Sequence, residues 1–237
     1  MQLFYTPRVE GNYTYLEADE AHHCIKVLRH AIGDAITCTD GRGNWYETTI
    51  ERVTKHEAAL RITKTIAQTP PLPCHLHLAL APTKNIDRTE WFVEKAVEMG
   101  VSEISLITTN ASERRTVRLD RLEGVALSAV KQSLKGHLPR INGLQSLTAF
   151  LAALHNDTTS VQKFIAHCRE GEKMALKHAY TAPRNALILI GPEGDFEETE
   201  ITAALAAGCA PVSLGNARLR TETAALAAVH TVVVMNT

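Results

Sequence analysis

The pattern of apolar residues changes at the segment TPPLP, residues 69 to 73, and this change limits the folds that the chain can adopt. Three prolines in five positions exclude a helix interior or a central strand, so the segment is expected to be a linker. Before it, the alternating segments AITCTD and WYETTIERV flank the Gly-rich turn DGRGN, and one helix is expected around EADEAHHCIKVLRHA. The alternation predicts a small antiparallel β-barrel or a sandwich.

After the linker, apolar segments such as HLHLALA and NALILI alternate with segments of helical periodicity. NIDRTEWFVEKAVEM predicts a helix that Gly100 ends, and FEETEITAALAA predicts a helix with Asp195 as its N-cap. Strands that are apolar on both faces and alternate with helices predict a parallel sheet covered on both sides. The chain is therefore predicted to hold a β domain over residues 1–70 and an α/β domain over residues 74–237.

The composition favours a soluble globular protein, since 45% of the 237 residues are apolar, 22% are charged, and the net charge is −1. Residues 112–140 are an exception, with seven Lys and Arg against three acids. Such a segment suits a polyanionic partner, although a solvated helix face would have the same composition.

The five cysteines are scattered and form no C-x-x-C pair, which suits a reducing cytoplasm and favours neither a disulfide framework nor a zinc site. His22 and His23 have no companion ligands at suitable spacing, so no metal is expected. No signal peptide is evident at MQLFYTPRVEG, and no apolar run approaches the roughly 20 residues of a membrane span.

Two glycine-containing turns follow predicted strands, in LILIGPEGDF and in SLGNARLRTETA. Ligands of open α/β sheets bind beyond the carboxyl ends of strands, and Gly191 and Gly194 would let the backbone approach a ligand. The alternative for the first motif is a tight turn that enters a capped helix. The chain lacks G-x-G-x-x-G after a strand, a P-loop and a G-x-S-x-G elbow, so a neutral or zwitterionic ligand held by backbone groups is favoured.

IGPEGDF followed by LGNARLRTETA is similar to the two late motifs of the SPOUT methyltransferases, which use S-adenosylmethionine. HHCIKVLRHAIGD with DGRGN, EKAVEMGV, SERR and KQSLKGHLPRI narrow the resemblance to the RsmE family, which methylates N3 of one uracil in 16S ribosomal RNA. The resemblance spans nearly the whole chain. It implies a PUA-like RNA-binding β-barrel, a trefoil-knotted α/β domain with a parallel sheet, a homodimer, and a cytoplasmic enzyme acting on the assembled small ribosomal subunit.

The chain departs from the family pattern at three places. Leu134 and Lys135 follow the glutamine-serine motif, where Gly-Arg is usual, and Asp195 replaces the second glycine of the GPEGG turn. In the last motif, Ala217 stands where the family often has Arg, with Arg218 one place later. These departures concern the RNA contacts more than the cofactor site.

The resemblance also implies site residues. The expected cofactor-binding residues are Ala166, His167, Leu189, Ile190, Gly191, Pro192, Glu193, Gly194, Leu214, Gly215, Asn216, Arg218, Leu219 and Thr223. The expected RNA-binding residues are Arg8, Arg29, Lys84, Arg114, Arg115 and Gln132. Each of the latter has the alternative of a solvated surface residue.

Arg220 and Glu222 are the predicted catalytic residues. Uracil N3 must lose its proton to become a nucleophile, and a guanidinium that donates to O2 or O4 would stabilise the resulting charge. Arg220 is predicted to do this, while Glu222 would orient Arg220 or accept the proton. Glu222 has the alternative role of an acid favoured by the helix dipole.

Three other functions compete with this one. A related SPOUT enzyme could methylate a ribose 2′-oxygen or another base, and the fold could serve as a non-catalytic RNA-binding module. The missing nucleotide and hydrolase motifs disfavour a dehydrogenase or a hydrolase. The last segment, TETAALAAVHTVVVM, is apolar on most helical faces, which predicts a helix partly buried in a homodimer.

Overall fold

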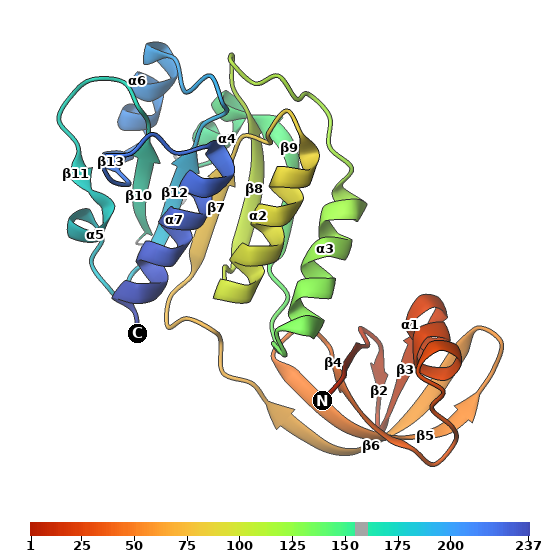
Figure 1. Ribbon diagram of the computed structural model, residues 1–237. Coiled ribbons are helices and arrows are strands. Elements are labelled where there is room, and N and C mark those ends of the chain that lie inside the picture. The colour runs from red at the N-terminus through yellow and green to blue at the C-terminus, as the bar shows by residue number, and fades with distance from the viewer. Residues whose placement is uncertain (155–160) are drawn as a thin grey trace. The chain divides into compact units, whose positions relative to one another are not determined.

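The computed structural model describes residues 1–154 and 161–237, which form two compact units (Figure 1). The N-terminal unit holds residues 1–71 and 127–138, and the C-terminal unit holds residues 72–126 and 139–237. The first division of the chain thus falls inside TPPLP. Residues 127–138 belong to the N-terminal unit although they lie outside the range 1–70 expected for the first domain.

The N-terminal unit contains one six-stranded sheet in the order β1-β4-β5-β6-β3-β2. Its strands are β1 (Leu3–Tyr5), β2 (Val9–Glu10), β3 (Tyr13–Glu17), β4 (Ala35–Thr39), β5 (Asn44–Val53) and β6 (Glu57–Ala67). All neighbouring pairs are antiparallel except β1 and β4, which are parallel. Leu16, Cys38, Ile50 and Leu60 are fully buried from four of these strands, so the alternating pattern produces the core.

The helix expected near residues 17–31 is present but divided. A short α1 (Ala18–His22) passes directly into a π-helix, η1 (His23–Val27). His22 and His23 lie at this junction, and Cys24 is buried beneath it.

Helix α3 (Leu119–Gln132) ends in the N-terminal unit with the hydrogen bonds of a Schellman motif. The Lys135 N–H donates to the Val130 carbonyl at 3.0 Å, and the Leu134 N–H donates to the Lys131 carbonyl at 3.4 Å. Leu134 has φ +54° at the position where glycine is preferred. One departure from the family pattern is thus a leucine held in a left-handed conformation.

The segment after α3 binds the Gly-rich turn between β4 and β5. The Gly43 N–H donates to the Gly136 carbonyl, and the Leu138 N–H donates to the Gly41 carbonyl, both at 2.8 Å. The family motifs DGRGN and KQSLKGHLPRI therefore meet within one unit, although more than 80 positions separate them in the sequence.

The C-terminal unit contains a seven-stranded sheet in the order β11-β13-β10-β12-β7-β8-β9. Its strands are β7 (Leu76–Leu80), β8 (Glu103–Thr108), β9 (Arg140–Ser146), β10 (Val161–Ala166), β11 (Met174–Ala175), β12 (Asn185–Ile190) and β13 (Ala210–Ser213). Every neighbouring pair is parallel, which confirms the predicted parallel sheet. The predictions from sequence did not include β9 or β11.

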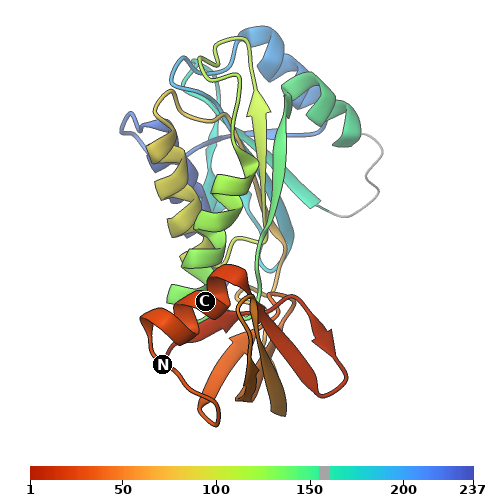
Figure 2. The same ribbon diagram turned by 90° about the vertical axis from the view of Figure 1, so that its right-hand side faces the viewer.

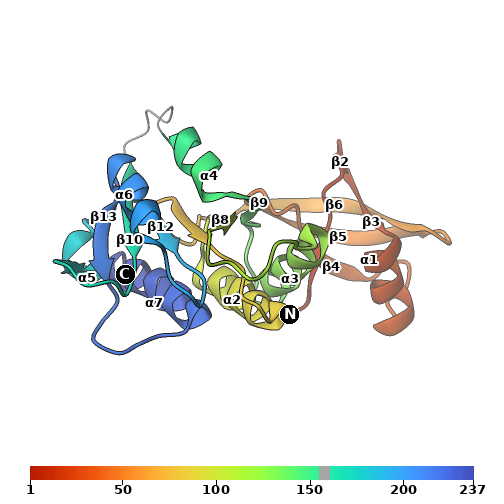
Figure 3. The same ribbon diagram turned by 90° about the horizontal axis from the view of Figure 1, so that it is seen from above.

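Helices cover both faces of this sheet. Helices α2 (Ile86–Met99) and α7 (Thr221–Met235) lie on one side, and α4 (Leu147–Leu154) and α6 (Glu198–Ala206) lie on the other (Figure 2, Figure 3). The short α5 (Leu176–Ala179) follows β11. Gly100 ends α2 with φ +94°, as predicted.

The predicted N-cap of α6 is wrong. Glu197 is the N-cap, and its N–H donates to the Glu200 carboxylate at 2.9 Å in a capping box. Asp195 lies two residues earlier, outside the helix, in a left-handed conformation with φ +64°.

Among residues 1–154 and 161–237, none of the helices combines the length and the hydropathy of a membrane-spanning segment. The five cysteines are all free. The trefoil knot that the resemblance implies stays a prediction.

Candidate functional site

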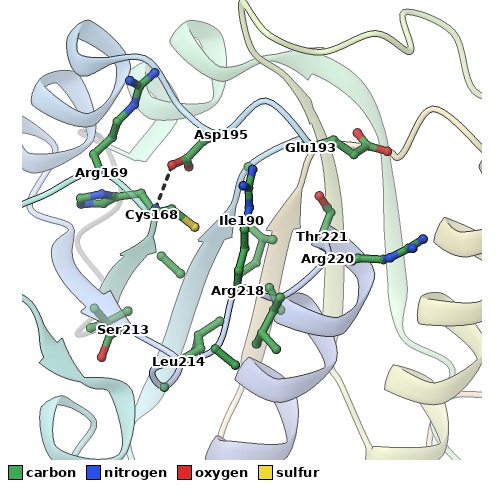
Figure 4. Close-up of a pocket in the computed structure, with 18 of the residues that line it drawn as sticks. Cys168, Arg169, Ile190, Glu193, Asp195, Ser213, Leu214, Arg218, Arg220 and Thr221 are labelled. Carbon is green, nitrogen blue, oxygen red and sulfur yellow. Dashed lines mark hydrogen bonds between the residues drawn. The ribbon is translucent and has the colours of Figure 1, made fainter.

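Three loops meet beyond the carboxyl ends of β10, β12 and β13, and they enclose a cavity of about 860 Å³ (Figure 4). The carboxyl ends of these three strands lie at one edge of the sheet because β13, β10 and β12 are parallel neighbours. The volume lies in the range of small-molecule sites. The cavity lies wholly within the C-terminal unit.

Most of the predicted cofactor-binding residues line this cavity. They are Ala166, His167, Ile190, Gly191, Pro192, Glu193, Gly194, Leu214, Gly215, Asn216, Arg218 and Leu219, together with the predicted catalytic residue Arg220. Leu189 does not, because its side chain is fully buried in the core on one face of the sheet. Thr223 also lies outside the lining and is exposed on α7.

Several lining residues were not predicted from the sequence, among them the loop that follows β10. The full set is Cys168, Arg169 and Lys173 after β10, together with Asp195, Val212, Ser213, Ala217, Thr221 and Ala224. Residues 168–173 carry no glycine-turn motif directly after their strand. The available signal was positional, because β10 pairs with both β12 and β13 and its end must face the same cavity.

The acidic segment 193–200 ties the loops of this sheet edge together. Glu193 accepts a hydrogen bond from the Lys84 N–H at 2.9 Å, in the loop after β7. Glu200 accepts one from the Asn110 N–H at 2.8 Å, after β8, and Asp195 accepts one from the Cys168 N–H at 2.8 Å, after β10. One segment therefore sets the position of three neighbouring loops.

The glycines of the two motifs are required for different reasons. A Cβ at Gly191 would lie 3.0 Å and 3.1 Å from two ring carbons of Phe196, which is fully buried. The close approach at Gly191 is thus to the protein's own core, so a side chain there would displace the ring of Phe196. At Gly215 a Cβ would meet nothing within 4 Å, but φ is +123°, which other residues rarely adopt.

Positive side chains dominate one part of the lining. Burial, together with the charges of Lys173 and Arg169, lowers the pKa of His167, so the ring is neutral at pH 7. Its Nδ1 is buried and has no partner among the described residues. Lys173 donates to the His167 carbonyl at 3.0 Å, and Arg169 donates to the Phe196 carbonyl at 3.3 Å.

Arg218 and Arg220 differ from these cations. Both are exposed, and neither side chain has a hydrogen bond or an ion pair with another described residue. Their side chains point in different directions from the loop before α7 (Figure 4). Arg220 is the N-cap residue of α7, so its guanidinium charge adds to the positive end of that helix dipole.

Glu222 does not line the cavity, and only 8% of it is exposed. Its Oε1 lies 3.8 Å from Nε of Arg88 in α2, and its Oε2 is buried without a partner among the described residues. The ion-pair partner of Glu222 is therefore Arg88, which sequence reasoning did not consider. A buried oxygen is poorly placed to take a proton from a base in the cavity.

Two of the predicted RNA-binding cations are neutralised within their own units. Arg8 donates to Glu57 at 2.9 Å, lies 3.8 Å from both Glu10 and Glu17, and stacks over the ring of Tyr15. In the C-terminal unit, Lys84 pairs with Glu113 at 2.8 Å.

Arg114 and Arg115 hold backbone groups. Arg114 donates to the carbonyls of Thr83 and Lys84, and Arg115 donates to those of Thr109 and Asn110. Both guanidinium groups therefore fasten the loops that follow β7 and β8.

Arg29 and Gln132 are exposed in the N-terminal unit, and Arg29 has φ +62°.

Across residues 1–154 and 161–237, no group of three or more His, Cys, Asp or Glu side chains could hold a metal ion.

Comparison with known proteins assigns both units. Residues 70–233 match the family described as an RNA methyltransferase domain, and residues 16–63 match the RNA methyltransferase PUA domain. A curated relative from Bacillus subtilis (strain 168), named ribosomal RNA small subunit methyltransferase E, is 26% identical over 92% of this chain and 88% of its own length.

Solved structures agree with these matches. The crystal structure of a probable rRNA-methyltransferase from Porphyromonas gingivalis is 38% identical, with a TM-score of 0.92 over 100% of this chain and 98% of the other. A ribosomal RNA small subunit methyltransferase E from Neisseria gonorrhoeae, solved bound to S-adenosyl methionine, is 28% identical, with a TM-score of 0.82 over 97% and 95% of the two chains.

Proposed function

This chain belongs to the RNA methyltransferase family whose curated members are named ribosomal RNA small subunit methyltransferase E, and we propose that it methylates N3 of one uridine in 16S ribosomal RNA with S-adenosylmethionine as methyl donor. The observation that supports this most directly is the cavity at the ends of β10, β12 and β13. Both late sequence motifs line it, and the unpaired Arg220 stands at its edge.

The residues of the cavity fit S-adenosylmethionine. Ile190, Val212, Leu214 and Leu219 supply apolar surface for a nucleoside, and the strand ends supply backbone donors and acceptors. The buried, unpartnered Nδ1 of His167 is a further polar atom available to a ligand. When bound, this cofactor supplies an electrophilic methyl group, so the protein mainly has to position the two reactants.

Arg220 has the charge that the reaction requires, and its guanidinium donors are unoccupied by the described residues. When N3 of uracil loses its proton to the surrounding water, negative charge spreads to O2 and O4, and a guanidinium that donates there lowers the energy of the transition state. The Arg220 side chain donates no hydrogen bond to a described residue, and it lies at the positive end of α7. We assign Glu222 to holding α2 through Arg88 rather than to proton transfer.

The N-terminal unit is proposed to hold RNA through its exposed cations, with Arg29 as the first candidate. Phosphate contacts of this kind give affinity that is sensitive to salt and largely independent of sequence. The assembled small subunit is the proposed substrate, and free cysteines suit the proposed cytoplasmic location.

A homodimer through α7 is part of the proposal. Val229 and Val232 are fully buried within the chain, whereas Val234 is 56% exposed and Met235 is 39% exposed. This remaining apolar surface suits an interface. Light scattering at micromolar concentration is expected to give the mass of a dimer, and a monomer would contradict this part of the proposal.

The reaction is tested by mass analysis of small-subunit RNA. Cells that lack the protein are expected to lose one N3-methyluridine, and purified protein with S-adenosylmethionine should restore it on isolated subunits. A restored ribose methylation, or a different methylated base, would instead favour another RNA methyltransferase activity. Absence of any change in both experiments would remove the proposed function.

A further inference from the structure

Asp195 joins two walls of the cofactor cavity, and no sequence argument assigned it a role there. Its Oδ2 accepts a hydrogen bond from the backbone N–H of Cys168 at 2.8 Å, drawn as the dashed line in Figure 4. Cys168 follows β10, and Asp195 follows β12. Both residues line the cavity.

A second hydrogen bond joins the same two loops, from Arg169 Nε to the carbonyl of Phe196 at 3.3 Å. Within the loop after β12, Asp195 Oδ1 also accepts a hydrogen bond from the Phe196 N–H at 2.8 Å. Phe196 is fully buried, so it anchors this arrangement in the core. The loop after β10 is therefore fastened to a rigid point on the loop after β12.

The backbone at Asp195 is in a conformation that side chains other than those of Asn and Asp rarely adopt. With φ +64°, this residue carries a local cost that glycine would not have. Such strain persists where the surrounding contacts maintain it, and it is concentrated at functional sites. The two hydrogen bonds to the carboxylate are the contacts that the aspartate gains in return.

We infer that Asp195 is a positioning residue for the cofactor, whose carboxylate holds Cys168 and the loop after β10 in the shape that S-adenosylmethionine requires. This inference rests on the proposed function, because it names the ligand of that same cavity. A loop fixed before binding loses less conformational entropy when the ligand arrives, so its fixation appears as affinity. Removal of the carboxylate should therefore weaken binding without weakening the fold.

Asp195→Gly separates these two effects. It removes both hydrogen bonds and also relieves the left-handed strain, so the melting temperature of the free protein should stay within about 3 °C of wild type or rise. The dissociation constant for S-adenosylmethionine, measured by calorimetry, should increase about tenfold, as expected for losing a hydrogen bond to a charged group. Asp195→Asn keeps one acceptor oxygen for Cys168 and tolerates this φ, so it should lie much closer to wild type.

Leu134→Gly is the matched control. Leu134 is also in a left-handed conformation, belongs to the N-terminal unit and does not line the cavity. Its replacement should relieve the same kind of strain and leave the dissociation constant unchanged. Hydrogen exchange gives a readout without ligand, since the Cys168 amide should exchange faster in Asp195→Gly than in wild type.

Four results would overturn the inference. They are wild-type affinity in Asp195→Gly, an equal loss of affinity in Leu134→Gly, an Asn variant as weak as the Gly variant, and unchanged exchange at Cys168. If the wild-type protein binds no S-adenosylmethionine, the proposed function fails instead, and the exchange measurement still decides whether Asp195 fixes the loop.

Discussion

His77 should make the stability of the C-terminal unit depend on pH below neutrality. The ring lies in β7 with its side chain 16% exposed, 2.8 Å from Ser105 Oγ and 4.0 Å from Glu103 Oε1. Burial lowers the pKa of His77 to about 4 from the ordinary 6.5. The charges of His75 and Arg140 also lower it, and these effects outweigh Glu103, which raises it.

The direction of the change in unfolding free energy with pH follows from how many protons His77 binds in the folded and in the unfolded chain. Between pH 6.5 and about 4 the unfolded chain binds a proton at His77 that the folded chain does not, so the free energy of unfolding falls as the pH falls through this window. Above pH 6.5 the His77 ring is neutral in both the folded and the unfolded chain, so its full contribution to the free energy of unfolding is present. The difference between a pKa of 6.5 and one of about 4, at about 1.4 kcal/mol for each tenfold change in the proton-binding constant, gives a loss on the order of 3 kcal/mol at pH 4.

Urea unfolding from pH 4 to pH 7.5 measures this loss in wild type and in His77→Gln. Each curve is referenced to its own value at pH 7.5, which removes the pH-independent cost of the substitution. The difference between the two referenced curves then removes the titration of the carboxylates that both proteins share. Wild type should lose about 3 kcal/mol more than the variant by pH 4. Parallel curves, or a titration of His77 by NMR with a midpoint near 6.5, would refute the reasoning.

Three further results are expected. Arg220→Ala should lower the single-turnover methylation rate about a hundredfold with little change in RNA affinity, and higher pH should partly restore it; saturating RNA that restores the full rate would make Arg220 a binding residue. Gly191→Val should lower the free energy of unfolding by about 2 kcal/mol in chemical denaturation through its clash with Phe196, and S-adenosylmethionine binding with it; wild-type stability would contradict this. Arg29→Ala should weaken RNA binding and flatten its salt dependence while cofactor affinity in calorimetry stays unchanged; an unaltered salt slope would count against it.

Local signals carried much of the architecture. The proline-rich linker, the period-2 segments before it and the strand–helix alternation after it depend only on neighbouring residues, and the structure confirms the parallel sheet they predict. Gly100 and the bounds of α7 were equally readable, because a C-terminal glycine and a helical apolar pattern act within a few turns. The N-cap of α6 was misplaced because DFEETE offers several acids within reach of one helix start.

Part of the candidate site could also be predicted from the sequence, and part could not. The motifs after β12 and β13 were readable as glycine-containing loops, and most of their residues line the cavity. The loop after β10 was not, since Cys168 and Arg169 carry no local signature and reach the cavity only because β10 pairs between β12 and β13.

The sequence by itself determined most of the elements, though not β9 or β11, together with the family resemblance and the position of both late motifs, because these depend on residue type and spacing along the chain. Only the tertiary structure decided which charges remain available. Arg8, Arg114, Arg115 and Glu222 resemble Arg220 in the sequence as charged candidates, yet each of the four has a protein partner while Arg220 has none among the described residues. The hydrogen-bond partners of the Arg8 and Arg114 guanidinium groups and the ion-pair partner of Glu222 lie 30 or more positions away in the sequence, so only packing decides whether such a charge is engaged or left free.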